Sequence, residues 1–388
     1  MSGPIRVASS PPAGHAGDGV SIPFVYVRAR GSYREIGRQI GEAARDQIRA
    51  SVGFFRDQFD SLSGGRMGFA AAERLALGYL EQARRHIPQH VEELEGLAEG
   101  SGVPFSELLV PNCGEEFTAS EPPESGGRAL APGSLRRGDR CTAVAVAVGG
   151  RHVIGHNMDW YVVDAANNVL FDVTVPDGTR LLGIAGAPYL LMIAVNSRGI
   201  GNVSNAVHSN DNRVGVPNAF IRRWSLEAGT LEEARERGLL AARARGTNHF
   251  LADTDGRLWD VETSVTAGVF SDHTVDGFMA HTNHYVAAEL AQFEGKAWDE
   301  SRVRLSTAER MLADGLAHGD DPVDLATRVL RCHEPSPEEC ICGHPDETQP
   351  VADQGMTVGS MIADLDERRL YACAGPPCEN EYQIFDMD

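Results

Sequence analysis

The pattern of hydrophobic and polar positions divides the chain into a helical part and a mixed part. From residue 31 to about residue 117, apolar residues recur at spacings of three and four, as in GSYREIGRQIGEAARDQIRASVGFFRDQF and AAERLALGYLEQARRHI. This period is typical of amphipathic helices. A further helix in HVEELEGLAEGSG is expected to end at Gly100-Ser101-Gly102, and a short helix follows. The pattern therefore predicts a helical segment over residues 31–118.

After residue 141 the apolar runs become short and alternate with polar residues. The first runs lie in CTAVAVAVGGRHVIGHNMDW, where a Gly-Gly turn separates the two strands of a predicted hairpin. Further strands are expected in NVLFDVTV, TRLLGIAGA, YLLMIAVN, IGNVSNAV, NHFLADTDGRLWDVET, VTAGVFSD and GFMAHTNHY, and a last hairpin in MTVGSMIADLDERRLYACAG. Helices are expected in PNAFIRRWSLEA, TLEEARERGLLAA, ESRVRLSTAERMLADGLA and DPVDLATRVL. This order favours layered sheets flanked by helices over regular βαβ repeats.

Two polar segments interrupt the pattern. The chain begins with MSGPIRVASSPPAGHAGDG, and we predict a flexible leader over residues 1–30. Residues 119–140 include ASEPPESGGRALAPGSLRRGD, where Pro, Gly, Ser and charged residues show no period, so we predict an exposed linker there. A domain or processing boundary belongs at its end. The remaining residues, 141–388, form the predicted core.

The charge of the chain excludes some classes of partner. Its formal charge is −20 at pH 7, which disfavours binding to nucleic acid and to anionic membranes. No apolar run approaches the roughly 18–20 residues that span a bilayer, and the N-terminus lacks the features of a secretion signal. We therefore expect a cytoplasmic protein without nucleic-acid or membrane partners.

The seven cysteines point to thiol chemistry rather than to a disulfide framework, because their number is odd and no secretion signal is apparent. Cys141 is the first residue of a predicted strand and directly follows the linker. A thiol there can attack the carbonyl of Arg140, and hydrolysis of the resulting thioester would free an N-terminal cysteine. Its α-amine, with a pKa of about 7.7–8, would then serve as its base. From position alone, a buried structural cysteine remains the alternative.

The surrounding residues resemble a known family. GDRCTAVAVAVGGRHVIGHNMDWY is similar to the nucleophile segment of the acyl-coenzyme A:6-aminopenicillanic acid acyltransferase family, in which Cys-Thr opens the mature β chain and an Asn-x-Asp-aromatic motif follows. The resemblance continues, in the family's order, through RGSYREIGRQIGE, LEGLAEGSGVPFSELLVPNCGEE, GVPNAFIRRWSLEAGTLEEA, NHFLADTDGRLWDVETS, HTNHY, ICGHP and TVGSMIADLDERRLYACAGPPCENEY. One departure is Arg140, where the best-known members have Gly.

The resemblance implies a fold and a reaction. The fold is α+β, the four-layer αββα sandwich of N-terminal-nucleophile hydrolases, and residues 31–118 become the α chain after cleavage. The reaction is hydrolysis or transfer of an acyl group at an amide or thioester bond, through an acyl-Cys141 intermediate. Its partners are a small-molecule acyl donor, an N-acyl amide or acyl thioester, and water or an amine as acceptor. No cofactor is implied.

The resemblance also implies roles for single residues. Asp159 holds the amino group and thiol of Cys141 in register. Asn283, in HTNHY, donates to the oxyanion of the reaction, with Asn248, in GTNHF, as the alternative. The family's Ser-Arg pair corresponds to Ser301 and Arg302, whose cation anchors Asp159 or a substrate carboxylate; Arg304 is the rival to Arg302. Contacts with substrate are expected from Thr142, Trp160, Tyr161 and Ser301.

Other residues suggest different chemistry. His156, His281 and His284 stand beside these motifs, and we expect structural roles for them, because an N-terminal nucleophile needs no histidine base. A second cluster consists of Cys332, Cys340, Cys342 and His344. Its single-residue gap between two cysteines is poor for zinc, so we expect no metal. A non-catalytic binding protein on the same scaffold and a zinc-binding regulatory protein remain the alternative functions.

Overall fold

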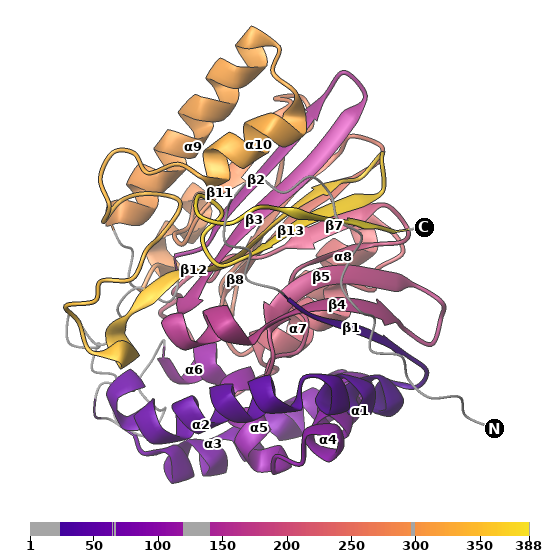
Figure 1. The fold of residues 1–388 in the computed structure, drawn as a ribbon, viewed down its shortest axis with the longest axis vertical. Coiled ribbons are helices and arrows are strands. Elements are labelled where there is room, and N and C mark those ends of the chain that lie inside the picture. Colours follow the sequence, from indigo (N-terminus) through magenta and orange to yellow (C-terminus); the bar gives the residue numbers. More distant parts are fainter. Residues whose placement is uncertain (1–23, 64, 66, 119–139, 296–298, 388) are drawn as a thin grey trace.

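The computed structural model describes residues 24–63, 65, 67–118, 140–295 and 299–387. The predicted linker lies outside these ranges except for Arg140, and so do residues 1–23 of the predicted leader. Within the described residues, two sheets are stacked between layers of helices (Figure 1). None of the helices described is both long enough and apolar enough to cross a bilayer.

The first sheet has eight strands in the order β1-β4-β5-β6-β7-β8-β9-β10. β1 runs parallel to β4, and the other neighbours are antiparallel. The strands are β1 (Val25–Arg30), β4 (Asn168–Thr174), β5 (Arg180–Gly186), β6 (Ala194–Asn196), β7 (Ile200–Val203), β8 (Thr247–Asp253), β9 (Leu258–Thr263) and β10 (Gly268–Asp272).

The second sheet has six antiparallel strands in the order β11-β2-β3-β12-β13-β14. They are β2 (Thr142–Val148), β3 (Arg151–Tyr161), β11 (Phe278–His281), β12 (Gly355–Asp364), β13 (Arg369–Ala374) and β14 (Gln383–Asp386). β2 and β3 form the hairpin predicted from the Gly-Gly turn, and Gly149 and Gly150 there both have positive φ, which glycine adopts without strain.

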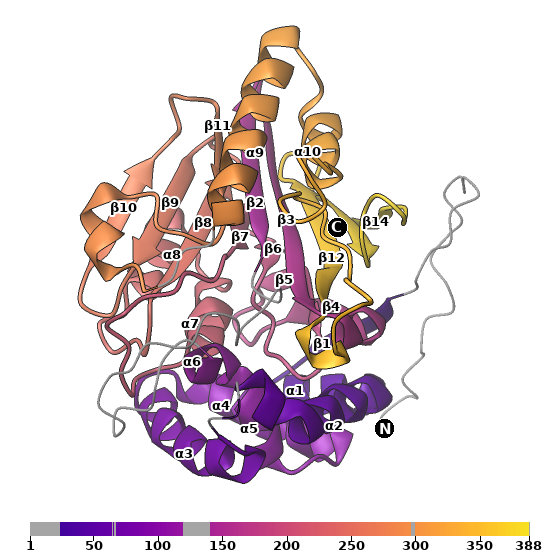
Figure 2. The ribbon, with the colours of Figure 1, turned by 90° about the vertical axis from the view of Figure 1, so that its left-hand side faces the viewer.

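The helices lie on the outer faces of the two sheets. They are α1 (Tyr33–Ala43), α2 (Arg45–Leu62), α3 (Phe69–His86), α4 (Pro88–Ser101), α5 (Phe105–Asn112), α6 (Gly114–Thr118), α7 (Asn218–Ser225), α8 (Leu231–Gly238), α9 (Asp299–His318) and α10 (Pro322–Leu330). Short 3₁₀ turns occupy Val162–Asn167, Ala288–Phe293 and Val351–Asp353. Figure 2 shows α1 to α5 grouped at one end of the molecule and α9 and α10 at the other.

Alternation of side chains along the strands creates the four layers. On β4, Val169 and Phe171 belong to the core shared with the N-terminal helices, whereas Leu170 between them faces the second sheet. On β2, Ala145 faces the first sheet, whereas Val144 packs in a core with residues of α9 and α10. Both sheets are thus apolar on both faces, because helices cover the outer one. This arrangement confirms the predicted αββα sandwich.

Two predicted boundaries were wrong. The predicted leader includes Val25–Arg30, but these residues form β1, which pairs in parallel with residues 169–174 of β4 at six positions. In YLLMIAVN, only Ala194–Asn196 is a strand. Tyr189 and Met192 instead line a pocket described below, so their apolar character reflects the pocket wall rather than a pleated strand.

Helices α1 and α4 approach each other unusually closely through glycines on both. A Cβ at Gly37 of α1 would overlap the backbone carbonyl of Glu93, and a Cβ at Gly96 of α4 would overlap the carbonyl of Arg34. Gly41 and Gly100 continue the same contact. Small residues let the two backbones meet, and the periodic glycines of both helices are explained by this packing.

Replacing Gly37 by Ala is therefore expected to destabilise the protein, by about 1–3 kcal/mol, because the added methyl forces backbones apart. Gly53→Ala is the matched control, since the nearest atom to a Cβ at Gly53 of α2 is an Arg56 nitrogen at 4.0 Å. That change removes a helical glycine and should stabilise by roughly 0.5–1 kcal/mol. Denaturant titration measures both. Equal stabilisation by the two changes would contradict the close helix contact.

Candidate active site

Cys141 lies immediately before β2, at the wall of a pocket. Its side chain is buried, with 8% of its surface exposed, and Sγ is 3.9 Å from the backbone oxygen of Asp159 on β3. The pocket holds about 770 Å³ of space free of atoms, including the part open to solvent. That is within the size range of small-molecule sites, which span roughly 300–1,000 Å³.

The lining of the pocket is apolar over most of its surface. The apolar residues come from both sheets, from α7 and from the end of α5; they are Pro111, Met158, Trp160, Ile184, Ala185, Tyr189, Met192, Ile193, Ala206, Ala219 and Val358. Trp160 is fixed by a hydrogen bond of 2.6 Å from its Nε1 to the hydroxyl of Tyr189.

Polar side chains lie at other positions of the wall. The carboxylate of Glu115 accepts a hydrogen bond from the guanidinium of Arg222, which also donates to Thr247 Oγ1 at 2.7 Å. Burial, together with the neighbouring Glu115, raises the pKa of Glu116 to about 7. Burial likewise raises the pKa of Asp164 to about 7. The pocket therefore combines a large apolar surface with two carboxyl groups that take up protons near neutral pH.

The opposite side of the β2–β3 hairpin holds a buried cluster around Arg304 of α9. Its Nη1 donates to the carbonyl oxygens of Arg140 at 2.6 Å and of Cys141 at 2.9 Å, and to Thr142 Oγ1 at 3.2 Å. Its Nη2 donates to Asn283 Oδ1 at 2.9 Å. Burial and the charge of Arg140 lower the pKa of Arg304 to about 10, so the guanidinium stays charged at neutral pH.

Asn283 is held in this cluster by several contacts. Its backbone N–H donates to Ser301 Oγ at 2.8 Å, and its side-chain Nδ2 donates to the carbonyl of Ala206, a pocket residue, at 3.0 Å. Asn248 lies elsewhere: its Nδ2 donates to Asp260, and its Oδ1 accepts from Asn205. The structure thus connects Asn283, through Arg304, to the backbone of Cys141, and leaves Asn248 in a separate network.

The structure does not bring Arg302 to this cluster. Its guanidinium donates to Glu294 at 2.7 Å, and about half of its side chain is exposed. The reason is helical geometry, because residues three apart share a face of a helix whereas adjacent residues do not. Ser301 is buried beside Asn283, so Arg304 shares its face and Arg302 points to solvent. The period of the helix, applied to α9, would have favoured Arg304 from the sequence.

Asp159 is buried on the face of β3 that points away from the pocket. Its Oδ1 accepts a hydrogen bond from Thr357 Oγ1 at 2.7 Å, and Gly343 packs against it so closely that a Cβ there would lie 3.0 Å from Oδ2. Burial raises the pKa of Asp159 to about 6, although the hydrogen bond from Thr357 and the charges of Arg140 and Arg304 lower it. Thr357 is a residue that the sequence analysis did not single out.

The predicted substrate contacts divide between the two sides of the hairpin. Successive residues of a strand point to opposite faces, so Met158 and Trp160 face the pocket while Asp159 faces Thr357. Of the four predicted contacts, Trp160 lines the pocket. Thr142 bonds Arg304, Ser301 bonds Asn283, and Tyr161 packs against the rings of Phe54 and Phe55, all away from the pocket lining.

The three histidines beside the motifs are all buried. His156 lines the pocket and bonds the carbonyl of Ser204 at 3.1 Å, and burial lowers its pKa to about 4. His281 bonds Glu262 at 3.0 Å, and His284 bonds Ser301 Oγ at 2.8 Å. These contacts fit the structural roles expected for them, which remain predictions.

Comparison with known proteins assigns the chain to a family. Residues 146–344, just over half of the 388 residues, match the model of the acyl-coenzyme A:6-aminopenicillanic acid acyl-transferases. The chain belongs to this family. It is therefore an acyl-transferring or amide-hydrolysing enzyme. The match begins after Cys141 and includes Asp159, Asn283 and Arg304.

Several solved structures match the chain over part of its length, among them proteins from two bacteria. Penicillin V acylase from Agrobacterium tumefaciens is 15% identical with a TM-score of 0.45; the match covers 64% of this chain and 86% of that one. Two single-residue variants of conjugated bile acid hydrolase from Clostridium perfringens are 14% and 13% identical, each with a TM-score of 0.40 and coverage of 64% of this chain and 97% of that one. No curated protein matches the chain by sequence.

The position of Arg304 predicts a large difference between two neighbouring arginines. Arg304→Gln should lower the free energy of unfolding by about 3–5 kcal/mol, because it leaves buried acceptors without their charged donor. Arg302→Gln, the matched control, removes a partly exposed ion pair with Glu294 and should cost at most about 1 kcal/mol. Urea denaturation of both purified variants measures the difference. Equal losses would show that Arg304 is no more deeply involved in the fold than Arg302.

Proposed function

We propose that this enzyme cleaves its own Arg140–Cys141 bond and then uses Cys141 as an N-terminal nucleophile. The observation that carries the proposal is the hydrogen bond of 2.6 Å from Arg304 Nη1 to the carbonyl oxygen of Arg140. This is the carbonyl that the thiol of the next residue would attack. A buried cation already bonded to it would stabilise the oxyanion that develops there.

The cleavage follows from the chemistry of adjacent groups. Sγ of Cys141 attacks the carbonyl carbon of Arg140 and forms a C–S bond. The C–N bond then breaks, and the nitrogen of Cys141 takes up a proton to become an amine. Water hydrolyses the thioester, which leaves a carboxylate on Arg140 and restores the thiol. Arg140 itself is buried, and its guanidinium donates to the carbonyl of Glu338 at 2.5 Å, so the residue before the bond is held in place.

The freed cysteine would carry out the acyl transfer. Its thiol faces the pocket, and its α-amine would act as the base that accepts the thiol proton. The amine would lie on the side of Asp159, whose carboxylate would hold it in position. For the acyl reaction we propose Asn283 as oxyanion donor and Arg304, in place of Arg302, as the residue that orients it. Water as acceptor gives hydrolysis, and a bound amine gives transfer.

The pocket supports an apolar acyl group as the part of the substrate next to Cys141. Met158, Trp160 and Met192 offer polarisable, apolar surface in the pocket that Cys141 also lines. A buried methylene contributes about 0.8 kcal/mol, which corresponds to about a fourfold gain in affinity. Amides of longer, apolar acids should therefore react faster than acetamides, until the pocket is full.

Self-cleavage predicts two chains in the purified protein, with masses of residues 1–140 and 141–388. Cys141→Ala should remain a single chain, because no thiol is present to attack. Arg304→Gln should slow cleavage by about 10²–10³, the loss typical of a missing oxyanion donor. Intact-mass spectrometry over time after synthesis measures each rate.

The control for this experiment is Arg302→Gln, which should cleave like the unchanged protein. Cleavage that persists in Cys141→Ala would contradict the mechanism. If Arg304→Gln cleaves at an unchanged rate while Cys141→Ala stays uncleaved, Cys141 remains the nucleophile. Arg304 then has no role in the cleavage.

The size of the acyl group can be tested by filling the pocket. Ala219→Phe adds a ring to the wall formed by α7 and should abolish the gain in kcat/KM for each added methylene, about fourfold in the unchanged enzyme. Acetyl amides should be affected least. Ala70→Phe on the exposed side of α3 is the matched control. Steady-state kinetics on a series of N-acyl amides checks this, and parallel losses for all chain lengths would place the acyl group elsewhere.

A further inference from the structure

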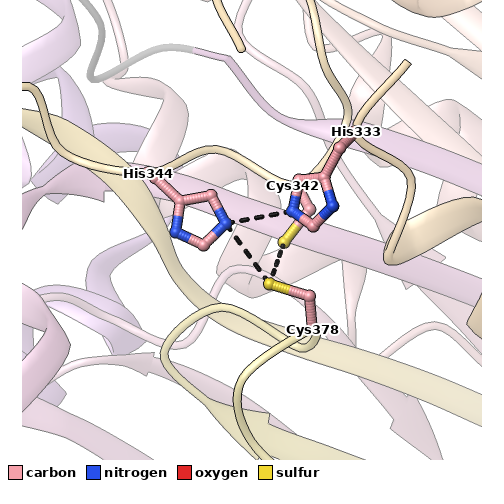
Figure 3. A group of neighbouring side chains, drawn as sticks. All are labelled: His333, Cys342, His344 and Cys378. Carbon is pink, nitrogen blue, oxygen red and sulfur yellow. Dashed lines mark hydrogen bonds between the residues drawn. The ribbon is translucent and has the colours of Figure 1, made fainter. Parts of the chain in front are cut away.

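Four side chains with metal-binding atoms converge beside β12, outside the pocket (Figure 3). His333 follows α10, Cys342 and His344 lie in the segment before β12, and Cys378 lies between β13 and β14. Their ligand atoms all lie within 4.8 Å of one another. Figure 3 shows both imidazoles and both thiols directed at a common point.

Three of the six separations among these four atoms are close to those of ligands around one tetrahedral ion, and all six are within 4.8 Å. The two Nε2 atoms are 3.0 Å apart, the two Sγ atoms 3.5 Å, and His344 Nε2 is 3.2 Å from Cys378 Sγ. Zinc bonds of about 2.3 Å to sulfur and 2.0–2.1 Å to nitrogen require roughly 3.3, 3.8 and 3.6 Å for the same separations. Each observed distance is within about 0.4 Å of that value.

A neighbouring carboxylate orients one of these ligands. Nδ1 of His344 is 3.3 Å from Oε1 of Glu379, on the side of the ring away from the cluster. A carboxylate in this position fixes the tautomer that leaves Nε2 free to bind a metal, as in many zinc sites. His333 is exposed whereas Cys342 is buried, so an ion can enter from the surface and be enclosed from below.

We propose that His333, Cys342, His344 and Cys378 bind one zinc ion. Two sulfur and two nitrogen ligands in a tetrahedral arrangement are typical of zinc, and four protein ligands close the coordination sphere, as in a structural site. The proposal departs from the expectation of no metal because the ligands differ from those considered in the sequence. Cys340 and Cys332 are directed elsewhere, so the short gap between Cys340 and Cys342 places no constraint on the site.

A bound ion would stabilise the segment before β12, which contacts both Arg140, at the proposed cleavage site, and Thr357. Gly343, between two of the ligands, donates its N–H to Thr357 Oγ1 at 2.9 Å, and Thr357 in turn bonds Asp159. The same segment supplies the carbonyl of Glu338 that accepts from Arg140. Bound zinc would therefore act as a brace for Asp159 and Arg140 and would take no part in the acyl reaction.

Metal analysis of full-length protein purified without chelator tests the site. About one zinc per chain is expected, and His333→Ala, His344→Ala and Cys378→Ser should each lose it on dialysis against a weak chelator. Cys340→Ser is the matched control and should retain it. His333 is exposed, so its replacement tests the site without disturbing the core. All variants are made with Cys141→Ala, so the result is independent of self-cleavage.

Cobalt substitution gives a second readout. Co²⁺ in place of zinc should produce the intense visible absorption of a tetrahedral ion and a thiolate charge-transfer band, both absent in Cys378→Ser. Two results would overturn the proposal: far less than one zinc per chain even after zinc is added, or unchanged zinc in His333→Ala and Cys378→Ser. A Cys342–Cys378 disulfide in freshly purified protein would also overturn it, by assigning the two thiols to each other.

Discussion

A single buried guanidinium connects several segments of the chain that meet around Cys141. Arg304 comes from the helical layer behind the second sheet, yet its donors reach the backbone before and after Cys141, the hydroxyl of Thr142 and the amide of Asn283. Removing such a charge from water is costly unless its donors find partners, and both terminal nitrogens of Arg304 do. The register of α9 against β2 and β11 is therefore constrained by the same contacts that set up the site.

The hairpin of β2 and β3 separates two environments. One face of β3 contributes Met158 and Trp160 to an apolar pocket, and the other contributes Asp159 to a polar cluster with Thr357. Because side chains alternate along a strand, one short segment contributes both to the pocket proposed to hold the acyl group and to the polar cluster around Asp159. The thiol stands where these two environments meet.

The sequence predicted the layered fold and most elements, because the periods of its helices and strands are regular. The prediction failed where apolar residues line a cavity. Tyr189 and Met192 were predicted to lie in a strand, but they line the pocket. It also failed where a strand is short and pairs far along the chain, as β1 does with β4. Arg302 was chosen because it is next to Ser301 in the sequence. On helix α9, however, Arg304 and not Arg302 lies on the same face as Ser301. The approach of Cys378 to Cys342 could not be predicted from the sequence. It depends on the pairing of β12 with β13, which brings the two distant segments together.

The pocket draws its wall from both sides of the proposed cleavage point. Pro111, Asn112 and Glu116 precede it, whereas Trp160, Met192 and Ala219 follow it. Cutting the chain at Arg140 would thus turn one polypeptide into a heterodimer whose ligand-binding surface is shared between subunits. The smaller subunit would be a permanent determinant of selectivity rather than a discarded propeptide. Evolution could then alter the acyl preference by changing that subunit alone, while the residues around the nucleophile stay unchanged.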